Sequence, residues 1–519
     1  MSNKVKFLPF VLTIVLLFAS CGSKDLSQTG DHSTTTGWDY NDPDWGGFEV
    51  AEAYDQETGP GLVFIEGGSF TMGRTEQDVL YEWNNVPRRV TLTSFYMDET
   101  EVRNVDYLEY LYWLQRVFSD MRDVYTSALP DTLVWLDPMG YNEPYVEYYL
   151  RHPAYSQYPV VGVSHIQARD YALWRTDRVN ERVLIDEGIL LMDPAGQQGA
   201  ENFNTDAYLA GQYIGLVGEN LPSMRPTNPS EGGGDAGTDP SGEGRGVRME
   251  DGLLFPKYRL PTEAEWEFAA LGLIGNTFEE RLWERRIYPW NGHTVRMHPD
   301  ENNAHTGEMR ANFVRGRGDY MGMAGDLNDN AAITAPVFSF WPNDYGLYCM
   351  AGNVNEWVAD VYRPLSHQDV SDFRPFRGNV FQTNARDETG ALLPKDRYGR
   401  IQKRDLDARD VKDYTQNYRQ ADYTDFKDGD LNSSIYYMER MRDSATSDAT
   451  AMYSQYRTAQ AEDITSLVNN RARVYKGGSW KDRAYWLSPG SRRFLDEAAA
   501  SSDLGFRCAM TRVGSPAGM

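Results

Sequence analysis

Short ordered segments, separated by two long stretches of poor hydrophobic patterning, limit how this 519-residue chain can fold. The two stretches cover roughly residues 183–250 and 365–470. Elsewhere the apolar runs are brief and end at glycine or polar residues, which is typical of a domain with little regular secondary structure. The length suits two or three average domains, and it suits one large domain with two long insertions equally well.

Local signals predict where several elements begin and turn. Residues 59–74 (GPGLVFIEGGSFTMGR) contain a strand-like apolar run that turns at Gly67–Gly68, which predicts a hairpin. Residues 90–97 and 159–163 predict two further strands. Asn104 is expected to cap a helix, because asparagine accepts hydrogen bonds from the first free N–H groups of a helix. The apolar face of that helix would consist of Val105, Leu108, Leu111 and Leu114.

Two more helices are predicted from capping boxes, in which a serine or threonine precedes a glutamine or glutamate by three positions. Ser164 and Gln167 predict a helix that continues through Trp174. Thr262 and Glu265 predict another in the segment RLPTEAEWEFAAL. Both helices should begin at these residues, because each box satisfies backbone N–H groups that the helix itself leaves free.

The poorly patterned stretches carry no motif that predicts chemistry. Residues 232–246 are rich in glycine, but no strand precedes them and no Gly-Lys-Ser/Thr follows. A flexible linker is therefore favoured over a phosphate-binding loop. Residues 394–414 (PKDRYGRIQKRDLDARDVKDY) mix both signs of charge, which is typical of a solvated surface, with a partner-binding insertion as the alternative.

The N-terminus resembles the export signal of a bacterial lipoprotein. Residues 1–20 combine a short basic start with an apolar run too brief to span a bilayer, and small residues lead directly into Cys21. This pattern predicts a lipid on Cys21, with an ordinary secretory signal cleaved near Ala19 as the alternative. Residues 21–58 would then form a polar tether and N-terminal extension, followed by a domain over 59–512 and a tail over 513–519.

Charge and cysteine content narrow the setting further. The formal net charge is −25, so the chain should be repelled by nucleic acid and by anionic lipid surfaces. With Cys21 acylated, Cys349 and Cys508 remain. In an oxidising periplasm these two could pair or stay as buried thiols, and the sequence leaves both outcomes open.

Five segments, in order, resemble the formylglycine-generating enzymes, also called sulfatase-modifying factors. They are GLVFIEGGSFTMG, FYMDETEVRNVDY, YPVVGVSHIQARDYALWR, RLPTEAEWEFAA with YPW at Tyr288, and GLYCMAGNVNEW leading to VYKGGSW and LGFRC. The resemblance implies an α+β domain, related to C-type lectin folds, with little regular secondary structure. The two poorly patterned stretches would be insertions in it.

Active members of the resembled family carry a cysteine pair, just after the Gly-Gly-Ser segment, that binds copper and activates oxygen. Aligned on Gly477–Gly478–Ser479, the two positions hold Asp482 and Leu487. Neither side chain can act as the soft thiolate that suits copper(I). The resemblance therefore implies a pseudoenzyme with no catalytic residue and no copper.

A histidine-rich iron site is the other metal centre known in this fold. The sequence groups His293, His298 and His305 in a loop that also contains Asp300 and Glu301. The histidines are five and seven positions apart and lack the spacing of ligands on one helix face. Solvated loop histidines are therefore favoured over a metal site.

The resemblance also implies structural calcium. The ligand positions of the first site match Asn312, Phe313, Asp329 and Ala331, and oxygen ligands of this kind suit a hard cation. The alternative is that Asn312 and Asp329 only cap loops. A second site would use Gly352, Val354 and Glu356, but the asparagine of the family falls on Cys349. Because sulfur is a poor calcium ligand, this second site is expected to be weakened or empty.

A narrower set of segments resembles the GldJ family of gliding-motility lipoproteins of Bacteroidetes. It includes TGWDYNDPDWGGF, EWNNVPRRV, SFYMDETEV and VYKGGSWKDRAYWLSPGSRRF. The likeness runs over nearly all of the mature chain and therefore favours GldJ over the related GldK (PorK) family.

This resemblance implies a non-catalytic lipoprotein on the periplasmic face of the outer membrane. It would be a structural component of the gliding motility and type IX protein secretion machinery, with the ring of GldK and GldN as its partner. A residual oxidase, or a ligand-binding module that uses the lectin-like cleft, is the alternative.

Overall fold

The computed structural model describes most of the chain outside the leader and the two long stretches. The described residues are 32–51, 55–74, 80–82, 84–218, 220–221, 245–277, 279, 282–283, 286–298, 303–316, 329, 331–363, 375–378, 380, 382–405 and 471–514. They fall into a large unit (Glu57–Glu219 and Leu254–Ser515) and a small one (Met1–Gln56, Asn220–Leu253 and Pro516–Met519). The predictions for Cys21, for the linker 232–244 and for residues 406–470 lie outside the described residues.

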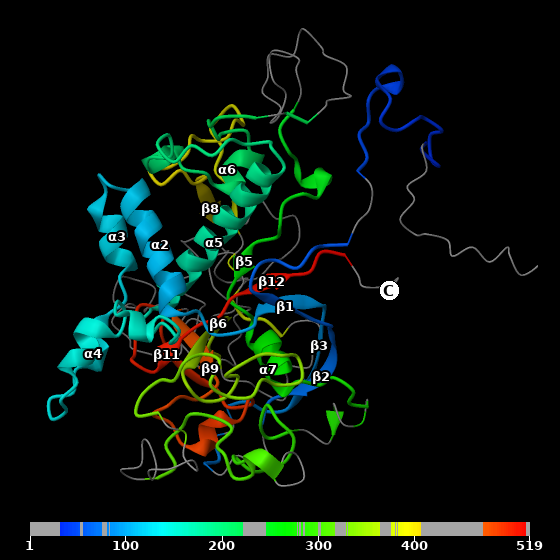
Figure 1. Cartoon of the computed structure of the whole chain (residues 1–519). Coiled ribbons are helices and arrows are strands. Elements are labelled where there is room, and N and C mark those ends of the chain that lie inside the picture. The colour runs from blue at the N-terminus through cyan, green and yellow to red at the C-terminus, as the bar shows by residue number, and fades with distance from the viewer. Residues whose placement is uncertain are drawn as a thin grey trace, which may run out of the picture. The chain divides into compact units, whose positions relative to one another are not determined.

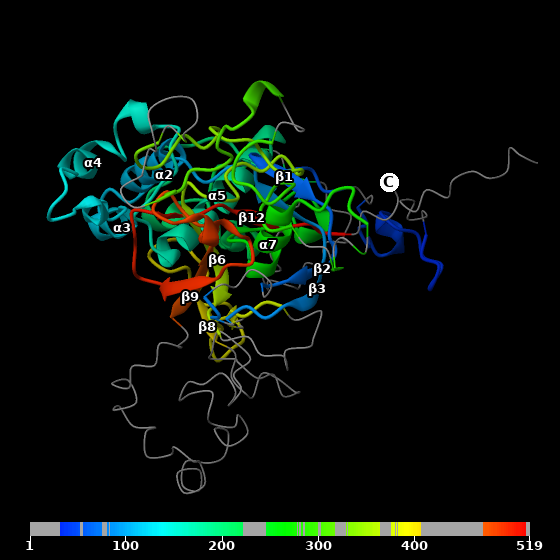
Figure 2. The same ribbon diagram turned by 90° about the horizontal axis from the view of Figure 1, so that it is seen from below.

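Two four-stranded sheets organise the large unit, and each joins strands that are far apart in the sequence. The first has the order β1 (Leu62–Ile65), β4 (Phe95–Asp98), β12 (Ala509–Thr511) and β5 (Tyr258–Arg259), with antiparallel neighbours. The second has the order β10 (Arg493–Asp496), β9 (Ala472–Lys476), β6 (Asn355–Val361) and β11 (Leu504–Gly505), and β11 runs parallel to β6. Figures 1 and 2 show β6 beside β9.

Two smaller sheets pair β2 (Gly68–Met72) with β3 (Arg88–Leu92) and β7 (Gln382–Asn384) with β8 (Lys403–Asp405). The hairpin predicted at Gly67–Gly68 is therefore wrong, because β1 pairs with β4 while β2 pairs with β3. At Gly67 the chain passes so close to β3 that an added Cβ would lie 2.4 Å from the Leu92 carbonyl oxygen. The glycine serves a close approach between sheets rather than a reversal.

The strand predicted over residues 90–97 is likewise two strands, the end of β3 and the start of β4, which belong to different sheets. Residues 159–163 form a single bridge between Pro159 and Arg103 instead of a strand. Both segments are apolar runs, but the backbone that pairs with each run determines which of its residues form a strand. Pairing is non-local, so the run alone cannot reveal it.

The α-helices are α2 (Asn104–Val117), α3 (Arg122–Ala128), α4 (Glu143–Tyr148), α5 (His165–Asp186), α6 (Thr205–Leu209) and α7 (Glu263–Leu271). Short 3-10 turns occur at η1 (Pro43–Trp45), η2 (Thr132–Trp135), η3 (Pro153–Tyr155), η4 (Gly199–Glu201), η5 (Met249–Asp251), η6 (Asn303–His305) and η10 (Ala484–Leu487). Among the described helices, none is both long and apolar enough to cross a membrane.

Both predicted capping boxes are confirmed. The Gln167 N–H donates to Ser164 Oγ at 3.2 Å, and the Glu265 N–H donates to Thr262 Oγ1 at 3.2 Å. The helix from Ser164 continues past Trp174 to Asp186. The cap predicted at Asn104 is displaced by one residue, since Asp106 accepts from the backbone N–H of Arg103. Asn104 lies inside the helix and donates to the carbonyl oxygens of Tyr149 and Tyr155.

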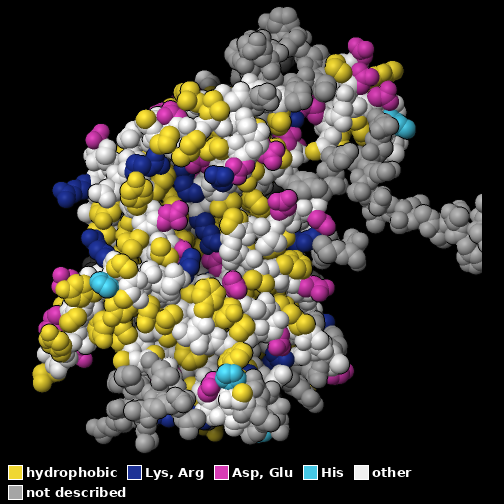
Figure 3. All heavy atoms as spheres, viewed as in Figure 1, with side chains coloured by type: hydrophobic (Ala, Val, Ile, Leu, Met, Phe, Trp, Pro, Cys, Tyr) yellow, Lys and Arg dark blue, Asp and Glu magenta, His cyan; other side chains and the backbone are white. Residues whose placement is uncertain are grey.

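The core of the large unit consists of two main apolar clusters. One packs α2 and α5 against the first sheet through aromatic residues such as Tyr107, Tyr171 and Phe506. The other surrounds α7 and includes Phe70 and Trp266. Figure 3 shows apolar side chains also gathered on the projecting α4 region at the lower left, where Met139 and Tyr141 are exposed.

The small unit is held in part by a compact charged cluster. Arg245 pairs with Glu49 at 2.7 Å and with Asp251 at 2.6 Å, and Arg248 lies 3.4 Å from the Glu49 carboxylate. The N–H of Arg248 also donates to Asp251, which starts η5. The contacts of Glu49 join residues that are about 200 positions apart in the sequence.

Candidate functional site

The Gly477–Gly478–Ser479 segment leaves the end of β9 and leads into η10. Gly477 and Gly478 have φ values of +103° and +72°, which L side chains rarely adopt. A Cβ on Gly478 would also lie 2.9 Å from the carbonyl oxygen of Trp486. The two glycines therefore let this loop fold closely over the residues that follow it, among them Asp482 and Leu487.

Asp482 is the centre of a charged hydrogen-bond network. The guanidinium of Arg493 donates to both carboxylate oxygens, at 2.8 and 2.7 Å. Ser479 Oγ donates at 2.7 Å and Asn355 Nδ2 at 3.2 Å. Burial alone would raise the pKa of Asp482, but the hydrogen bonds and charge of Arg493 outweigh it and hold the pKa below its ordinary value. The carboxylate is thus ionised and fully committed to its neighbours.

The guanidinium of Arg493 is itself enclosed by aromatic rings. Its central carbon lies 4.9 Å from the centre of the Tyr475 ring and 4.5 Å from that of Trp486. Bidentate pairing and ring contacts together fix the plane of the guanidinium. The position that corresponds to the first catalytic cysteine is therefore occupied by a rigid ion pair.

Leu487, at the second position, is fully buried. It packs in an apolar cluster with Met309, Ala311, Phe313 and Ala351. An apolar environment of this kind disfavours a charged ligand set. The arrangement of Asp482 and Leu487 does not fit a copper ion.

The free thiols in the described part of the chain do not replace the missing pair. Cys349 and Cys508 are both buried and form no disulfide, which answers the question of their pairing that the sequence left open. Burial raises the pKa of each thiol, and the nearby carboxylates of Glu101 and Asp98 add to the effect. Both sulfurs are held as neutral thiols, the form that binds metals poorly.

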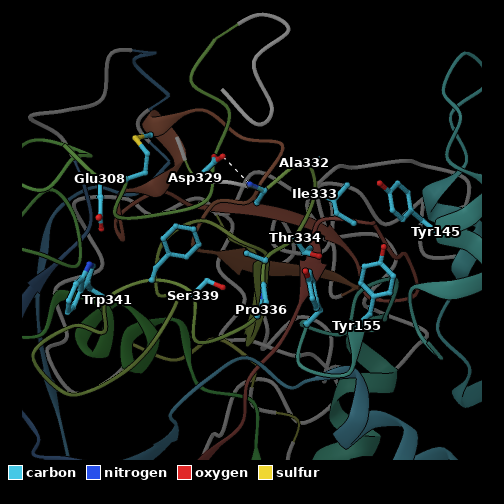
Figure 4. A pocket seen from close by; sticks show the side chains of 15 residues that line it. Tyr145, Tyr155, Glu308, Asp329, Ala332, Ile333, Thr334, Pro336, Ser339 and Trp341 are labelled. Atoms are coloured by element: carbon cyan, nitrogen blue, oxygen red, sulfur yellow. Dashed lines mark hydrogen bonds between the residues drawn. The ribbon is translucent and has the colours of Figure 1, made fainter. Parts of the chain in front are cut away.

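Two residues predicted for the first calcium site, Asp329 and Ala331, line a hollow of about 550 Å³ (Figure 4). Phe313 is near enough for its backbone N–H to bond Asp329, whereas Asn312 is not among the lining residues. The Asn312 side chain is buried, and its Nδ2 donates to the Ile333 carbonyl oxygen at 2.8 Å. Its Oδ1 is buried without a hydrogen-bond partner in the described part of the chain. A buried acceptor of this kind is unfavourable unless something else satisfies it.

Asp329 completes this set of oxygens. Burial raises the pKa of Asp329, and backbone N–H groups of Ala331 and Phe313 offset the shift only in part. The bond from the Ala331 N–H is long, at 3.4 Å. A carboxylate and an unpartnered amide oxygen are donors of the type that a hard cation such as Ca²⁺ prefers.

The residues predicted for the second calcium site are arranged differently. Glu356 is fully buried, and Arg507 donates to both of its oxygens at 2.7 Å. Trp266 Nε1 donates to the same carboxylate at 2.8 Å. Cys349, in place of the asparagine, donates its thiol to the Val337 carbonyl oxygen at 3.4 Å. The charge of Glu356 is already neutralised by protein, so this set of residues does not fit a second cation.

Gly352 and Val354, the carbonyl contributors to that second site, serve the loop before β6. Gly352 has a φ of +77°, and an added Cβ would lie 2.4 Å from the Asn312 carbonyl oxygen. Val354 is fully buried. The loop is thus closely packed on the segment that carries the first site.

The profile of the sulfatase-modifying factor enzyme 1-like domain matches residues 47–512. The chain belongs to this family. The match and the mixture of helices and strands agree with the α+β class predicted from the sequence.

Curated members of the family match shorter segments. A formylglycine-generating enzyme of Streptomyces coelicolor is 33% identical over 132 residues, which are 25% of this chain and 35% of that protein. An inactive C-alpha-formylglycine-generating enzyme 2 of Bos taurus is 33% identical over 156 residues, 27% of this chain and 42% of that protein. The matched segments thus span less than half of these relatives. A structure of PvdO from Pseudomonas aeruginosa aligns over 87% of this chain and 94% of that chain, with a TM-score of 0.39 and 14% identity.

The histidines do not form a metal centre in the described part of this family member. His293 and His298 are exposed, and His305 lies 3.0 Å from Glu308. The described residues contain no group of three or more histidine, cysteine, aspartate or glutamate side chains that would hold a metal ion. Asp300 and Glu301 lie outside those residues.

Arg493 and Glu101 are site residues that the sequence reasoning missed. Glu101 accepts from Asn353 Nδ2 at 3.1 Å, and burial together with the charge of Glu356 raises its pKa. A glutamate inside the family segment FYMDETEVRN was a usable signal for Glu101. For Arg493 the signal was weaker, because the arginine lies in a different element from the aspartate it neutralises.

Proposed function

We propose that this chain is a non-catalytic member of the sulfatase-modifying factor family that acts as a structural component of an envelope complex. The observation that carries the proposal is the ion pair of Asp482 with Arg493, which stands where active members have a copper-binding cysteine. Leu487 occupies the position of the second cysteine and is part of a buried apolar cluster. The family also contains proteins named as inactive, so loss of the chemistry has precedent within it.

We place the protein at the periplasmic face of the outer membrane, anchored by a lipid on Cys21. There it would support gliding motility and type IX secretion, in contact with the ring of GldK and GldN. The support is the resemblance of the leader and of segments such as VYKGGSWKDRAYWLSPGSRRF to gliding-motility lipoproteins. The acidic character of the chain, with a net charge of −25, favours protein partners over nucleic acid.

Calcium is the metal we assign to the protein, in a structural role. Asn312 Oδ1, the Phe313 carbonyl, the Asp329 carboxylate and the Ala331 carbonyl would supply oxygen ligands. Bound calcium would satisfy the buried acceptor of Asn312 and compensate the carboxylate of Asp329. It would hold the 329–331 segment against the Asn312 loop.

Gene deletion tests the role of the protein directly. Deletion should abolish gliding and secretion by the type IX route, and the ring lipoprotein should co-purify with the intact protein from detergent-solubilised envelopes. A deletion strain that still glides and secretes would contradict the proposal. The variant Cys21→Ala should fold normally but leave the membrane fraction. If Cys21→Ala still fractionates with the outer membrane, a lipid on Cys21 is not what anchors the protein.

The tyrosine-lined hollow beside Asp329 supports a second candidate, a ligand-binding module. Tyr145, Tyr155 and Trp341 line its wall (Figure 4). A residual oxidase would instead consume oxygen with a cysteine-containing peptide, in a manner that depends on Asp482. Because Asp482 is held by Arg493, we expect no such consumption.

A further inference from the structure

The two insertions meet each other on the family domain. Asn202 Nδ2, from the first, donates to the carbonyl oxygen of Tyr398, in the second, at 2.8 Å. Lys395 Nζ donates back to the Ala200 carbonyl oxygen at 3.0 Å. The φ of Gly399 is +77°, and a Cβ there would lie 2.8 Å from the same Ala200 oxygen, so the backbones are in close contact. Segments that look unstructured by pattern thus form one packed surface.

Helix α5 fixes this surface in place. The carboxylate of Asp177 accepts from the Thr205 N–H at 2.8 Å and from Asn204 Nδ2 at 3.0 Å. The Arg178 guanidinium donates to the Phe203 carbonyl oxygen at 2.7 Å. Side chains from two consecutive positions of a long helix therefore hold the first insertion, which in turn holds the second.

A pocket of about 440 Å³ lies between the insertions and helices α2, α3 and α5, which are grouped at the upper left of Figure 1. This volume is in the range of ligand sites. Aromatic side chains form much of its wall: Tyr110, Trp113, Phe118, Trp174 and Tyr398. The pocket shares no lining residue with the Asp482 position or with the predicted calcium ligands.

The charges of the lining residues are unequal. Three aspartates line the pocket, against Arg400 as the one cation in the described wall. Asp123 is paired with Arg397 at 3.0 Å, and Asp177 is held by the first insertion. No hydrogen bond or ion pair engages the carboxylate of Asp170 in the described part of the chain. Asp170 is close enough to Tyr110 for its charge to add to the effect of burial on the pKa of that tyrosine.

We propose that this pocket binds the cationic side chain of a lysine or arginine that a protein partner presents. Aromatic faces attract a guanidinium or ammonium group, as the rings of Trp113 and Tyr398 already do with Arg178 and Arg397. The carboxylate of Asp170 is available to pair with an incoming cation. The net charge of −25 favours a basic partner at long range. The inference does not rest on the proposed scaffold role.

Calorimetric titration of the full-length protein in detergent tests the site. The probe is acetyl-Gly-Arg-Gly-amide, compared with the same peptide containing citrulline, which keeps the shape of arginine but has no charge. The arginine peptide should bind about tenfold more tightly than the citrulline peptide. The variant Asp170→Asn should remove most of this difference without changing the Tm, because no hydrogen bond of the fold depends on that carboxylate.

Two variants complete the test. Asp186 lies on the same helix and pairs with the exposed Arg182. The control variant Asp186→Asn should therefore leave the affinity for the arginine peptide unchanged. Arg400→Ala removes a like charge from the wall and should tighten binding by a few-fold. Equal affinity for the arginine and citrulline peptides, an unchanged affinity in Asp170→Asn, or weaker binding in Arg400→Ala would overturn the proposal. Spermidine that binds as tightly as the peptide would assign the pocket to a free amine instead of a protein.

Discussion

The Asp482 position and the Asn312–Asp329 position belong to the same unit, but their polar atoms are satisfied in opposite ways. Around Asp482, the protein itself supplies a guanidinium, a hydroxyl and an amide. At Asn312, the buried Oδ1 has no partner among the described residues, and Asp329 accepts a long bond of 3.4 Å. The protein itself satisfies the polar atoms at the first position, whereas it leaves one buried acceptor unsatisfied at the second.

The difference concerns two separate expectations from the family resemblance. At the positions expected for a copper-binding cysteine pair, the structure has an ion pair and a buried apolar side chain. At the positions expected for calcium it has oxygen-bearing residues, and one acceptor among them, Asn312 Oδ1, has no partner in the described part of the chain.

Removing Arg493, which neutralises Asp482, should have the largest effect on the free energy of unfolding. Arg493→Ala leaves the Asp482 carboxylate largely buried without its cation, and such a loss lowers the free energy of unfolding by roughly 3–5 kcal/mol. Denaturation in urea at pH 7 measures it. The matched control is Arg182→Ala, which breaks the exposed pair with Asp186 and should change the free energy by less than about 1 kcal/mol.

The pH dependence of that loss gives an independent check. The pKa of Asp482 is lowered in the folded state, so its stabilisation is present above the unfolded pKa and disappears as the pH falls through the folded pKa. The difference between wild type and Arg493→Ala should therefore shrink in acid. A difference that stays constant down to pH 2 would mean that packing of Arg493, and not its charge, stabilises the fold.

Chelation of calcium should have the next largest effect on stability, and it tests the Asn312–Asp329 position. If calcium binds at Asn312 and Asp329, saturating calcium at a hundredfold excess over Kd should stabilise the protein by about 2.7 kcal/mol. Thermal unfolding with calcium or with EGTA measures this. Asp329→Asn should unfold at the temperature of the chelated wild type and should not respond to calcium. A variant that still gains stability from calcium would place the ion elsewhere.

A further pH effect is expected from Asp360, a buried aspartate whose pKa moves in the opposite direction to that of Asp482. It accepts from the N–H groups of Glu263 and Arg377, but burial and the charge of Glu263 raise its pKa to about 7. A raised carboxyl pKa makes the folded state bind the extra proton, so stability should fall as the pH rises from about 4 to 7. Asp360→Asn should flatten this slope in urea titrations. An unchanged slope would show that Asp360 is ionised throughout.

The parts of the fold that the sequence predicts well are local. The boxes at Ser164 and Thr262 need only residues three positions apart, and both form as expected. The hairpin at Gly67–Gly68 fails because the partners of β1 and β2 lie 16 to 36 positions away in the chain, from Met72 with Arg88 to Leu62 with Asp98, where no pattern marks them. Strand pairing is decided by tertiary packing, which hydrophobic alternation does not encode.

The candidate sites show the same contrast between residues that a local pattern identifies and residues that meet only in the folded chain. The resemblance to the family points to Asp482 and Asn312 because both positions can be counted from segments that look like the family's motifs. It does not point to Arg493, whose guanidinium reaches the Asp482 loop from strand β10. The pocket between the insertions is harder still, since Asn202 and Tyr398 come from stretches without hydrophobic periodicity and meet only in the folded chain.

We propose that the Asp482 position does not support oxidase chemistry. The most direct measurement adds copper(I) to the purified protein in the presence of a competing chelator, and then follows oxygen uptake with a cysteine-containing peptide. We predict that the chelator keeps the copper and that oxygen uptake stays at the rate of the peptide alone. Stoichiometric copper binding with oxygen uptake that disappears in Asp482→Ala would contradict the account.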